Sequence, residues 1–225
     1  LETSETRYRV TLSAGTKAED GMDLSQSADF NAATPERLPD DATMEKAFRE
    51  VLDQVMALRN APLAEPYIGP AILRNRASGV FFHEIFGHRI EGHRQKDVTE
   101  GQTFTKKLNQ QILPDFISVY DDPTLARVGD TDLRGHYLFD DEGVRSSRVP
   151  LVKNGVLETF LMSRRPLEKI ANSNGHGRRQ SGFASVSRQA NLIVESSKQV
   201  PFDELRKLLV EECKKQGKPY GVIFE

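Results

Sequence analysis

The chain has 225 residues, of which 37% are hydrophobic and 28% are charged. This composition is typical of a folded globular protein and excludes a disordered, collagenous or coiled-coil chain. Lys and Arg number 31 against 33 for Asp and Glu, and the formal net charge of -2 gives no general attraction for nucleic acid or anionic lipid. From this charge balance we expect no nucleic-acid partner. No apolar run approaches the roughly 18 residues that span a bilayer, so we also expect no membrane span.

The first part of the chain predicts a strand, a loop and a helix. Residues 8–12 alternate in polarity like a strand, and residues 28–41 are rich in Pro, Asp and Asn, which predicts a loop. Over residues 42–59 the apolar side chains recur at steps of three and four, which predicts an amphipathic helix. Prolines at 62, 66 and 70 then form a connector, and this connector predicts a boundary between an N-terminal part and the main domain.

The main domain contains predicted strands and helices in separate clusters. In chain order we expect a helix over 78–91, a strand over 116–120, a hairpin over 149–161, a strand over 190–195 and a helix over 201–216. The hairpin is the clearest of these, because Asn154-Gly155 tolerates the positive φ angles of a type I′ turn. The pattern predicts an α+β fold with a mixed or antiparallel sheet and packed helices, rather than a doubly wound sheet.

Three of the five histidines fall within residues 83–93. Neutral imidazoles are good zinc ligands, and a glutamate beside the first histidine can take a proton from a water molecule that the metal activates, as in His-Glu-x-x-His helices. This chemistry points to His83 and His88 as metal ligands and to Glu84 as a general base. The alternative is that both histidines are partly buried and bonded to neighbouring groups in the core.

The spacing between these histidines is one residue longer than in His-Glu-x-x-His. Five steps of about 100° place His88 roughly 140° from His83 on a regular α-helix, so a straight helix cannot direct both at one metal. We therefore predict a distorted helix at residues 86–88. Gly87 is the residue expected to permit it, through a π-bulge or a relaxed turn.

A catalytic zinc ion normally has three protein ligands and a water molecule. Glu91 and His93 are the candidates for the third ligand in this chain. Cys213 is the weaker candidate, because it continues the apolar stripe of the last predicted helix, where a free cysteine packs as a small hydrophobic residue.

Two further segments are candidates for substrate contact. The acidic turn at 140–143 offers Asp141, which could orient a histidine or a peptide amine. The segment 173–179 offers His176 and Arg178, which suit the binding of a carboxylate or an oxyanion. For both segments the alternative is an ordinary surface loop.

Four motifs together resemble the TldD/PmbA family of metallopeptidases. They are His-Glu-Ile-Phe-Gly-His-Arg-Ile-Glu-Gly at 83–92, Asp-Asp-Glu-Gly at 140–143, Lys-Asn-Gly-Val-Leu at 153–157 and Asn-Gly-His-Gly-Arg at 174–178. The resemblance implies the TldD-type subunit, which carries the His-Glu-x-x-x-His motif, binds zinc and acts on peptides. It also implies a cytoplasmic location, although a missing N-terminal export signal would alter that expectation. The implied partner is a second copy of the chain or a TldE/PmbA-like subunit.

The resemblance also implies which parts of the family's protein are missing here. The family's third zinc ligand is a cysteine in a Cys-Gly-Lys setting of a C-terminal domain, and nothing around Cys213 matches that setting. We therefore expect a fragment that lacks the C-terminal domain. Residues 1–65 are expected to be the remnant of an N-terminal domain, and residues 66–225 the metallopeptidase core.

Two hypotheses about function follow. The first is a zinc-dependent peptidase that hydrolyses peptides or unfolded proteins with Glu84 as general base. The second is a non-catalytic interaction or assembly subunit of a TldD/PmbA-type complex, in which the histidines serve packing. The metal content of the purified chain distinguishes them.

Overall fold

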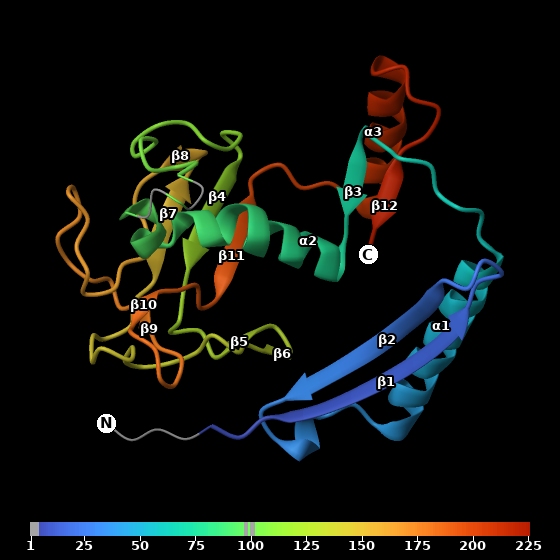
Figure 1. The fold of residues 1–225 in the computed structure, drawn as a ribbon, viewed down its shortest axis with the longest axis horizontal. Helices are drawn as coiled ribbons and strands as arrows, with labels where there is room; N and C mark the ends of the chain where they lie inside the picture. The colour runs from blue at the N-terminus through green and yellow to red at the C-terminus, as the bar shows by residue number, and fades with distance from the viewer. Residues whose placement is uncertain (1–4, 97–98, 100–101) are drawn as a thin grey trace. The chain divides into compact units, whose positions relative to one another are not determined.

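The computed structural model describes residues 5–96, 99 and 102–225 (Figure 1). The described residues form α-helices and small sheets that are mostly antiparallel, which confirms the α+β prediction. The chain divides into two compact units, one made of Leu1–Tyr67 with Gly129–Asp132, the other of Ile68–Val128 with Leu133–Glu225. Within the described residues, no helix combines the length and the apolar character needed to cross a membrane.

The first unit is a long hairpin packed against one helix. Strands β1 (Tyr8–Lys17) and β2 (Asp23–Ala32) pair antiparallel along their whole length, and α1 (Asp41–Asn60) packs on them. The side chain of Asp40 caps α1 by accepting a 2.9 Å hydrogen bond from the backbone N–H of Thr43. The helix predicted at 42–59 is confirmed. The loop predicted at 28–41 is wrong in its first part, because residues 28–32 pair with the alternating residues 8–12 and so continue β2.

The centre of the second unit is a four-stranded antiparallel sheet in the order β11-β4-β7-β8. Its strands are β4 (Ile117–Asp121), β7 (Val149–Lys153), β8 (Val156–Leu157) and β11 (Leu192–Ser196). Asn154 and Gly155 join β7 to β8 with φ angles of 47° and 80°, which confirms the predicted turn. The core on this sheet consists of Phe86, Ile90, Val119, Val149, Leu151, Val152, Leu157, Phe160, Leu161 and Met162.

The remaining elements of this unit are short strands and two helices. The helices are α2 (Asn75–Phe81) and α3 (Phe202–Lys215), which ends just before Gly217 at φ 63°. β3 (Ala71–Leu73) pairs parallel with β12 (Val222–Phe224). The other short strands of this unit are β5 (Arg127–Val128), β9 (Gly177–Arg178) and β10 (Val186–Ser187). Strand β6 (Thr131–Asp132) belongs to the first unit. Cys213 is buried on α3, where a Cβ added to Gly221 would lie 2.9 Å from its Sγ. This close packing agrees with the expectation of a structural cysteine.

Candidate metal centre

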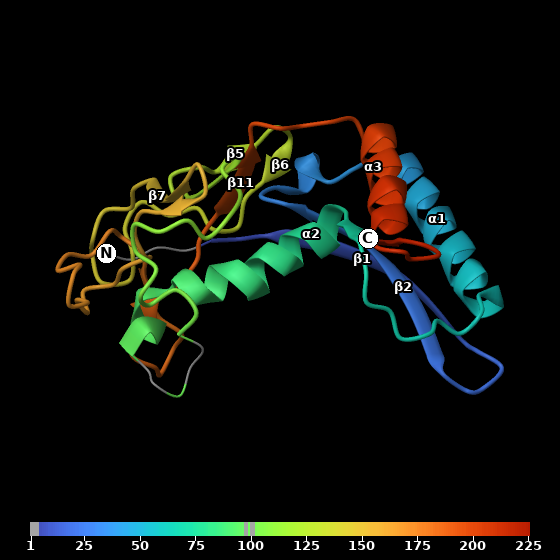
Figure 2. The same ribbon diagram turned by 90° about the horizontal axis from the view of Figure 1, so that it is seen from above.

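The helix that carries the histidines widens after α2. Residues Phe82–Phe86 form a π-helix and Gly87–Ile90 a 3-10 turn, so the helical path continues with a changed pitch (Figure 2). A π-turn accommodates one more residue than an α-turn, which compensates for the extra residue between the two histidines. The predicted distortion is confirmed, and it begins at Phe82, earlier in the chain than the expected residues 86–88.

Gly87 contributes space rather than backbone freedom. Its φ of -58° and ψ of -48° are ordinary helical values that any residue adopts. A Cβ at this position would collide with the side-chain amide of Gln189. The role expected for Gly87 is therefore corrected: the absence of a side chain admits Gln189 beside the π-turn.

The π-turn brings His83, Glu84 and His88 together. Each offers one ligand atom, and these atoms lie within 4.8 Å of one another. The two imidazole rings lie 4.5 Å apart between centroids at an interplanar angle of 72°. The Glu84 carboxylate lies 3.9 Å from Nε2 of His83 and 3.7 Å from Nε2 of His88. Two imidazoles and a carboxylate form a donor set that suits zinc and other transition metals, so these residues fit a metal ion.

Glu91 lies behind His88 rather than inside this group. It is fully buried, and its Oε1 is 3.2 Å from Nδ1 of His88. Its Oε2 accepts a 2.8 Å hydrogen bond from Nε of Arg94, and Nε of Arg188 is 3.5 Å from Oε1. With Nδ1 occupied in this way, Nε2 of His88 is the nitrogen that faces Glu84. Carboxylates commonly orient metal-binding histidines through the nitrogen that does not bind the metal.

His93 also lies outside the group of ligand atoms in the described part of the chain. Burial lowers its pKa, because the charged imidazolium loses solvation, although the nearby Glu91 carboxylate acts in the opposite direction. Its Nδ1 is buried and has no hydrogen-bond partner in the described structure. Neither Glu91 nor His93, the two candidates for the third metal ligand, therefore lies in the group formed by His83, Glu84 and His88.

Gln189, which is not among the site residues predicted from the sequence, reaches the site from far along the chain. Its Nε2 lies 3.5 Å from the carbonyl oxygen of His83 and 3.5 Å from Nδ1 of His88, at sequence separations of 106 and 101 residues. It also lines a cavity of about 600 Å³ between the π-turn and β11, together with Asn75, Ser78, Gly79, Phe82, His83, Ala190, Leu192 and Val194. No local motif around Gln189 indicates this placement.

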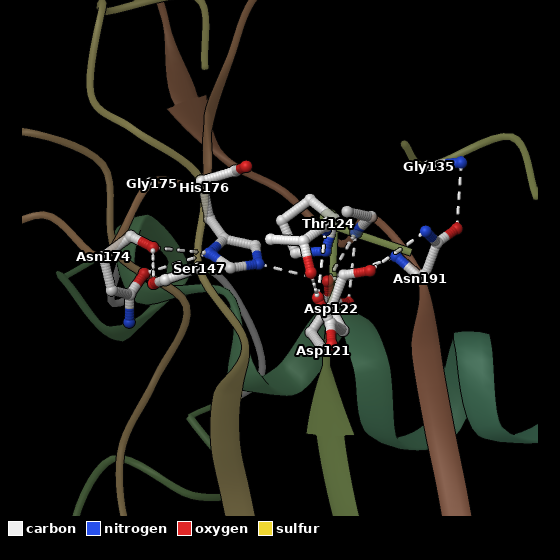
Figure 3. Close-up of polar contacts among 12 residues, drawn as sticks. Asp121, Asp122, Thr124, Gly135, Ser147, Asn174, Gly175, His176 and Asn191 are labelled. Carbon is white, nitrogen blue, oxygen red and sulfur yellow. Dashed lines mark hydrogen bonds and ion pairs between the residues drawn. The ribbon is translucent and has the colours of Figure 1, made fainter. Parts of the chain in front are cut away.

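His176 is fully buried instead of lying on a surface loop. Its Nε2 is 3.1 Å from Oδ1 of Asp121, and its Nδ1 is 3.1 Å from the carbonyl oxygen of Asn174 (Figure 3). Asp121, also fully buried, accepts hydrogen bonds of 3.1 to 3.2 Å from the backbone N–H groups of Ala190 and Asn191. This network fixes the segment that carries Gln189.

Asp141 and Arg178 lie next to each other, and both side chains are partly exposed. Oδ2 of Asp141 is 3.2 Å from Nε of Arg178 and accepts a 2.7 Å hydrogen bond from the backbone N–H of Arg179. The neighbouring Asp140 is buried, and its carboxylate accepts hydrogen bonds from the backbone N–H groups of Glu142, Val144 and Gly177. The acidic turn is therefore bonded to β9 through Asp140 and Asp141 and is not a fully solvated loop.

Several curated proteins resemble this chain. A metalloprotease of Archaeoglobus fulgidus is 34% identical over 176 residues, which cover 77% of this chain and 38% of that protein. A metalloprotease TldD homolog of Haemophilus influenzae is 28% identical over 70% of this chain and 31% of its own length. A zinc metalloprotease TldD homolog of Saccharolobus solfataricus is 32% identical over 47% of this chain and 21% of its own length. The chain thus spans well under half of each relative.

Solved structures share the fold. A proposed modulator of a DNA gyrase from Thermotoga maritima superposes with a TM-score of 0.66 at 23% identity, over 89% of this chain and 42% of that chain. TldE from Thermococcus kodakarensis superposes with a TM-score of 0.55 at 18% identity, over 84% of this chain and 46% of that one. At these identities the likeness establishes the fold alone.

A family model assigns most of the chain. Residues 67–215 match the model described as the PmbA/TldA metallopeptidase C-terminal domain. The expectation that this chain lacks the family's C-terminal domain is therefore wrong, because the matching region is itself that domain. From this match, and from the metalloproteases that resemble the same region, the chain belongs to the PmbA/TldD metallopeptidase family.

Proposed function

We propose that this chain carries the metal-binding part of a zinc-dependent peptidase of the TldD type. The observation that supports this most directly is that the π-turn, which carries His83 and Glu84, and the 3-10 turn after it, which carries His88, bring the ligand atoms of these three residues within 4.8 Å of one another. His83 and His88 would hold the metal. The name of the Saccharolobus solfataricus relative supports zinc as that metal.

When bound there, zinc supplies Lewis-acid chemistry, since it polarises a carbonyl group and lowers the pKa of water to about 7. Glu84 would accept a proton from the attacking water and return it to the leaving amine. Its side chain is exposed and lies 3.7 Å and 3.9 Å from the two imidazoles, so it can reach a reacting group beside them. Glu91 would act as a positioning residue that holds His88 through Nδ1.

The cavity beside His83 offers a place for the substrate. β11 is an edge strand of the described sheet, and Leu192 and Val194 line the cavity from that strand. An edge strand can bind an extended peptide through main-chain hydrogen bonds, which tolerates different side chains. We propose that a peptide lies along β11 with one of its bonds next to the pair of histidines.

The partner is part of the same proposal. One structural neighbour is named TldE, which supports pairing of this chain with a TldE/PmbA-like subunit. A homodimer is the other arrangement that we consider. The non-catalytic assembly role is the competing function, and the metal measurement below distinguishes it.

The first test is the zinc content of the purified chain. We expect about one zinc ion per chain after dialysis against a weak chelator, and loss of that zinc in His88→Ala, because one of two imidazole ligands is removed. His136→Ala is the matched control, since Nδ1 of His136 lies 3.0 Å from the carbonyl oxygen of Pro123 and the residue is outside the group. Absence of zinc from the wild-type chain, or equal zinc in His88→Ala, would contradict the proposal.

A second test addresses the positioning role of Glu91. Glu91→Gln is expected to weaken zinc binding about 10-fold to 100-fold, because the amide lacks the charge that orients and polarises the His88 ring. Competition with a chromophoric chelator measures this affinity, and circular dichroism verifies the fold. Glu158→Gln, an exposed change with the same chemistry, is the control. An unchanged zinc affinity in Glu91→Gln would show that the contact has no such role.

A further inference from the structure

A second cavity lies beside the site, and its lining is strongly basic. Its volume is about 730 Å³, and among the residues that the structure describes its lining contains no Asp or Glu but four arginines: Arg134, Arg178, Arg179 and Arg188. The chain as a whole has a formal net charge of -2, so this local excess of positive charge is not a consequence of composition. We call this cavity the arginine pocket.

Two of the four guanidinium groups are held in place by neighbouring side chains. Arg178 lies over the ring of Tyr137 at 4.2 Å from the centroid, with its Nε 3.2 Å from Asp141. The hydroxyl of Tyr137 donates a 2.9 Å hydrogen bond to the carbonyl oxygen of Gly175. Arg188 has its Nε 3.5 Å from the buried Glu91. The two ion pairs with Asp141 and Glu91 are made through Nε, and a guanidinium has further N–H donors beyond Nε.

The arginine pocket adjoins the cavity beside His83. Gln189 and Ala190 both belong to the lining of both cavities. Their segment is anchored by the Asp121 carboxylate through the backbone N–H groups of Ala190 and Asn191 (Figure 3). Because an extended peptide advances about 3.3 Å per residue, a peptide leaving the His83 cavity over this segment reaches the arginine pocket within a few residues.

We propose that the arginine pocket binds a carboxylate of the peptide substrate. The carboxylate belongs either to an acidic side chain or to the C-terminus of the peptide, and arginine binds both through the same planar, charge-assisted hydrogen bonds. The proposal rests on the peptidase function proposed above, and it specifies the class of substrate: peptides with a carboxylate a few residues from the bond at His83.

The test is a binding measurement that does not depend on cleavage. Four peptides of one length and sequence differ only in Glu or Gln at one position and in a free or amidated C-terminus. Each is titrated by calorimetry into the full chain carrying Glu84→Gln. We expect the peptide with the matching carboxylate to bind about 10-fold more tightly than its neutral counterpart, and this preference to weaken with added salt.

Charge reversal at one arginine of the pocket provides a second test of the proposal. Arg179 is exposed and lines the pocket, so Arg179→Glu should remove the preference without disturbing the fold. Arg165→Glu makes the same change at an exposed arginine outside the lining and should leave the preference intact.

The outcomes separate the sources of the carboxylate. A difference between Glu and Gln peptides assigns the pocket to an acidic side chain, and a difference between acid and amide assigns it to the C-terminus. Four peptides of equal affinity, or none that binds, would overturn the proposal, as would equal losses in Arg179→Glu and Arg165→Glu. A wild-type chain that binds zinc and cleaves all four peptides equally retains the peptidase function without the pocket. A preference for the carboxylate in a chain that cleaves none of them supports the pocket and contradicts the peptidase function.

Discussion

Replacing Glu84 by Gln is expected to lower the rate of peptide hydrolysis by roughly 10² to 10⁴-fold while the zinc content stays the same. The amide keeps the size of the side chain but cannot accept a proton from water. His83 and His88 are unchanged in this variant, so the metal should be retained. The experiment measures kcat with a fluorogenic peptide and zinc by elemental analysis, on the same preparation of the longest available form of the protein.

Glu158→Gln is the control for this variant, because it makes the same change at an exposed position outside the group of ligand atoms. Full activity of Glu84→Gln would contradict the role of general base. Loss of zinc together with activity would show that Glu84 acts mainly as a ligand, which its distances of 3.7 Å and 3.9 Å to the imidazoles also allow geometrically.

Replacing Asp121 by Ala is expected to destabilise the chain by about 3 to 5 kcal/mol. The carboxylate is fully buried, so its removal leaves His176 and the backbone N–H groups of Ala190 and Asn191 without their acceptor (Figure 3). Buried donors without a partner cannot recover the loss from solvent. Urea unfolding followed by circular dichroism measures the change.

Asp115→Ala is the matched control for Asp121→Ala, because Asp115 is exposed. It is expected to change the stability by less than about 0.5 kcal/mol. A similarly small change in Asp121→Ala would mean that the Asp121 network contributes little to stability and that the Gln189 segment is held by other contacts.

The spacing of the histidines was enough to predict the distorted helix. Two histidines five positions apart cannot share a face of an α-helix, and the observed π-turn at Phe82–Phe86 brings them together. The turn at Asn154-Gly155 was equally predictable, because few other residue pairs adopt two successive positive φ angles. Both features depend on residues close together in sequence.

The residues that contact and position the histidines of the site could not be predicted, because they lie in segments far away along the chain. Gln189 is 101 residues from His88, and Asp121 is 55 residues from His176, so no pattern within a window of ordinary length connects them. The glycines around His176 indicate a surface loop. In the structure, Gly175 instead adopts a φ of 80° and allows the chain to pass close to Arg145, which places His176 inside.

The separation of 106 residues between His83 and Gln189 has a consequence for biosynthesis. At about 5 to 20 residues per second, a ribosome synthesises the two histidines about 5 to 20 seconds before it reaches Gln189. During that interval the nascent chain has the imidazole and carboxylate groups of the site, but the segment with Gln189 that contacts them in the folded chain has not yet been synthesised. For the metal site proposed above, capture of an ion by the growing polypeptide would therefore be less selective than capture by the folded chain, so the order of folding and metal loading would affect which ion the site binds.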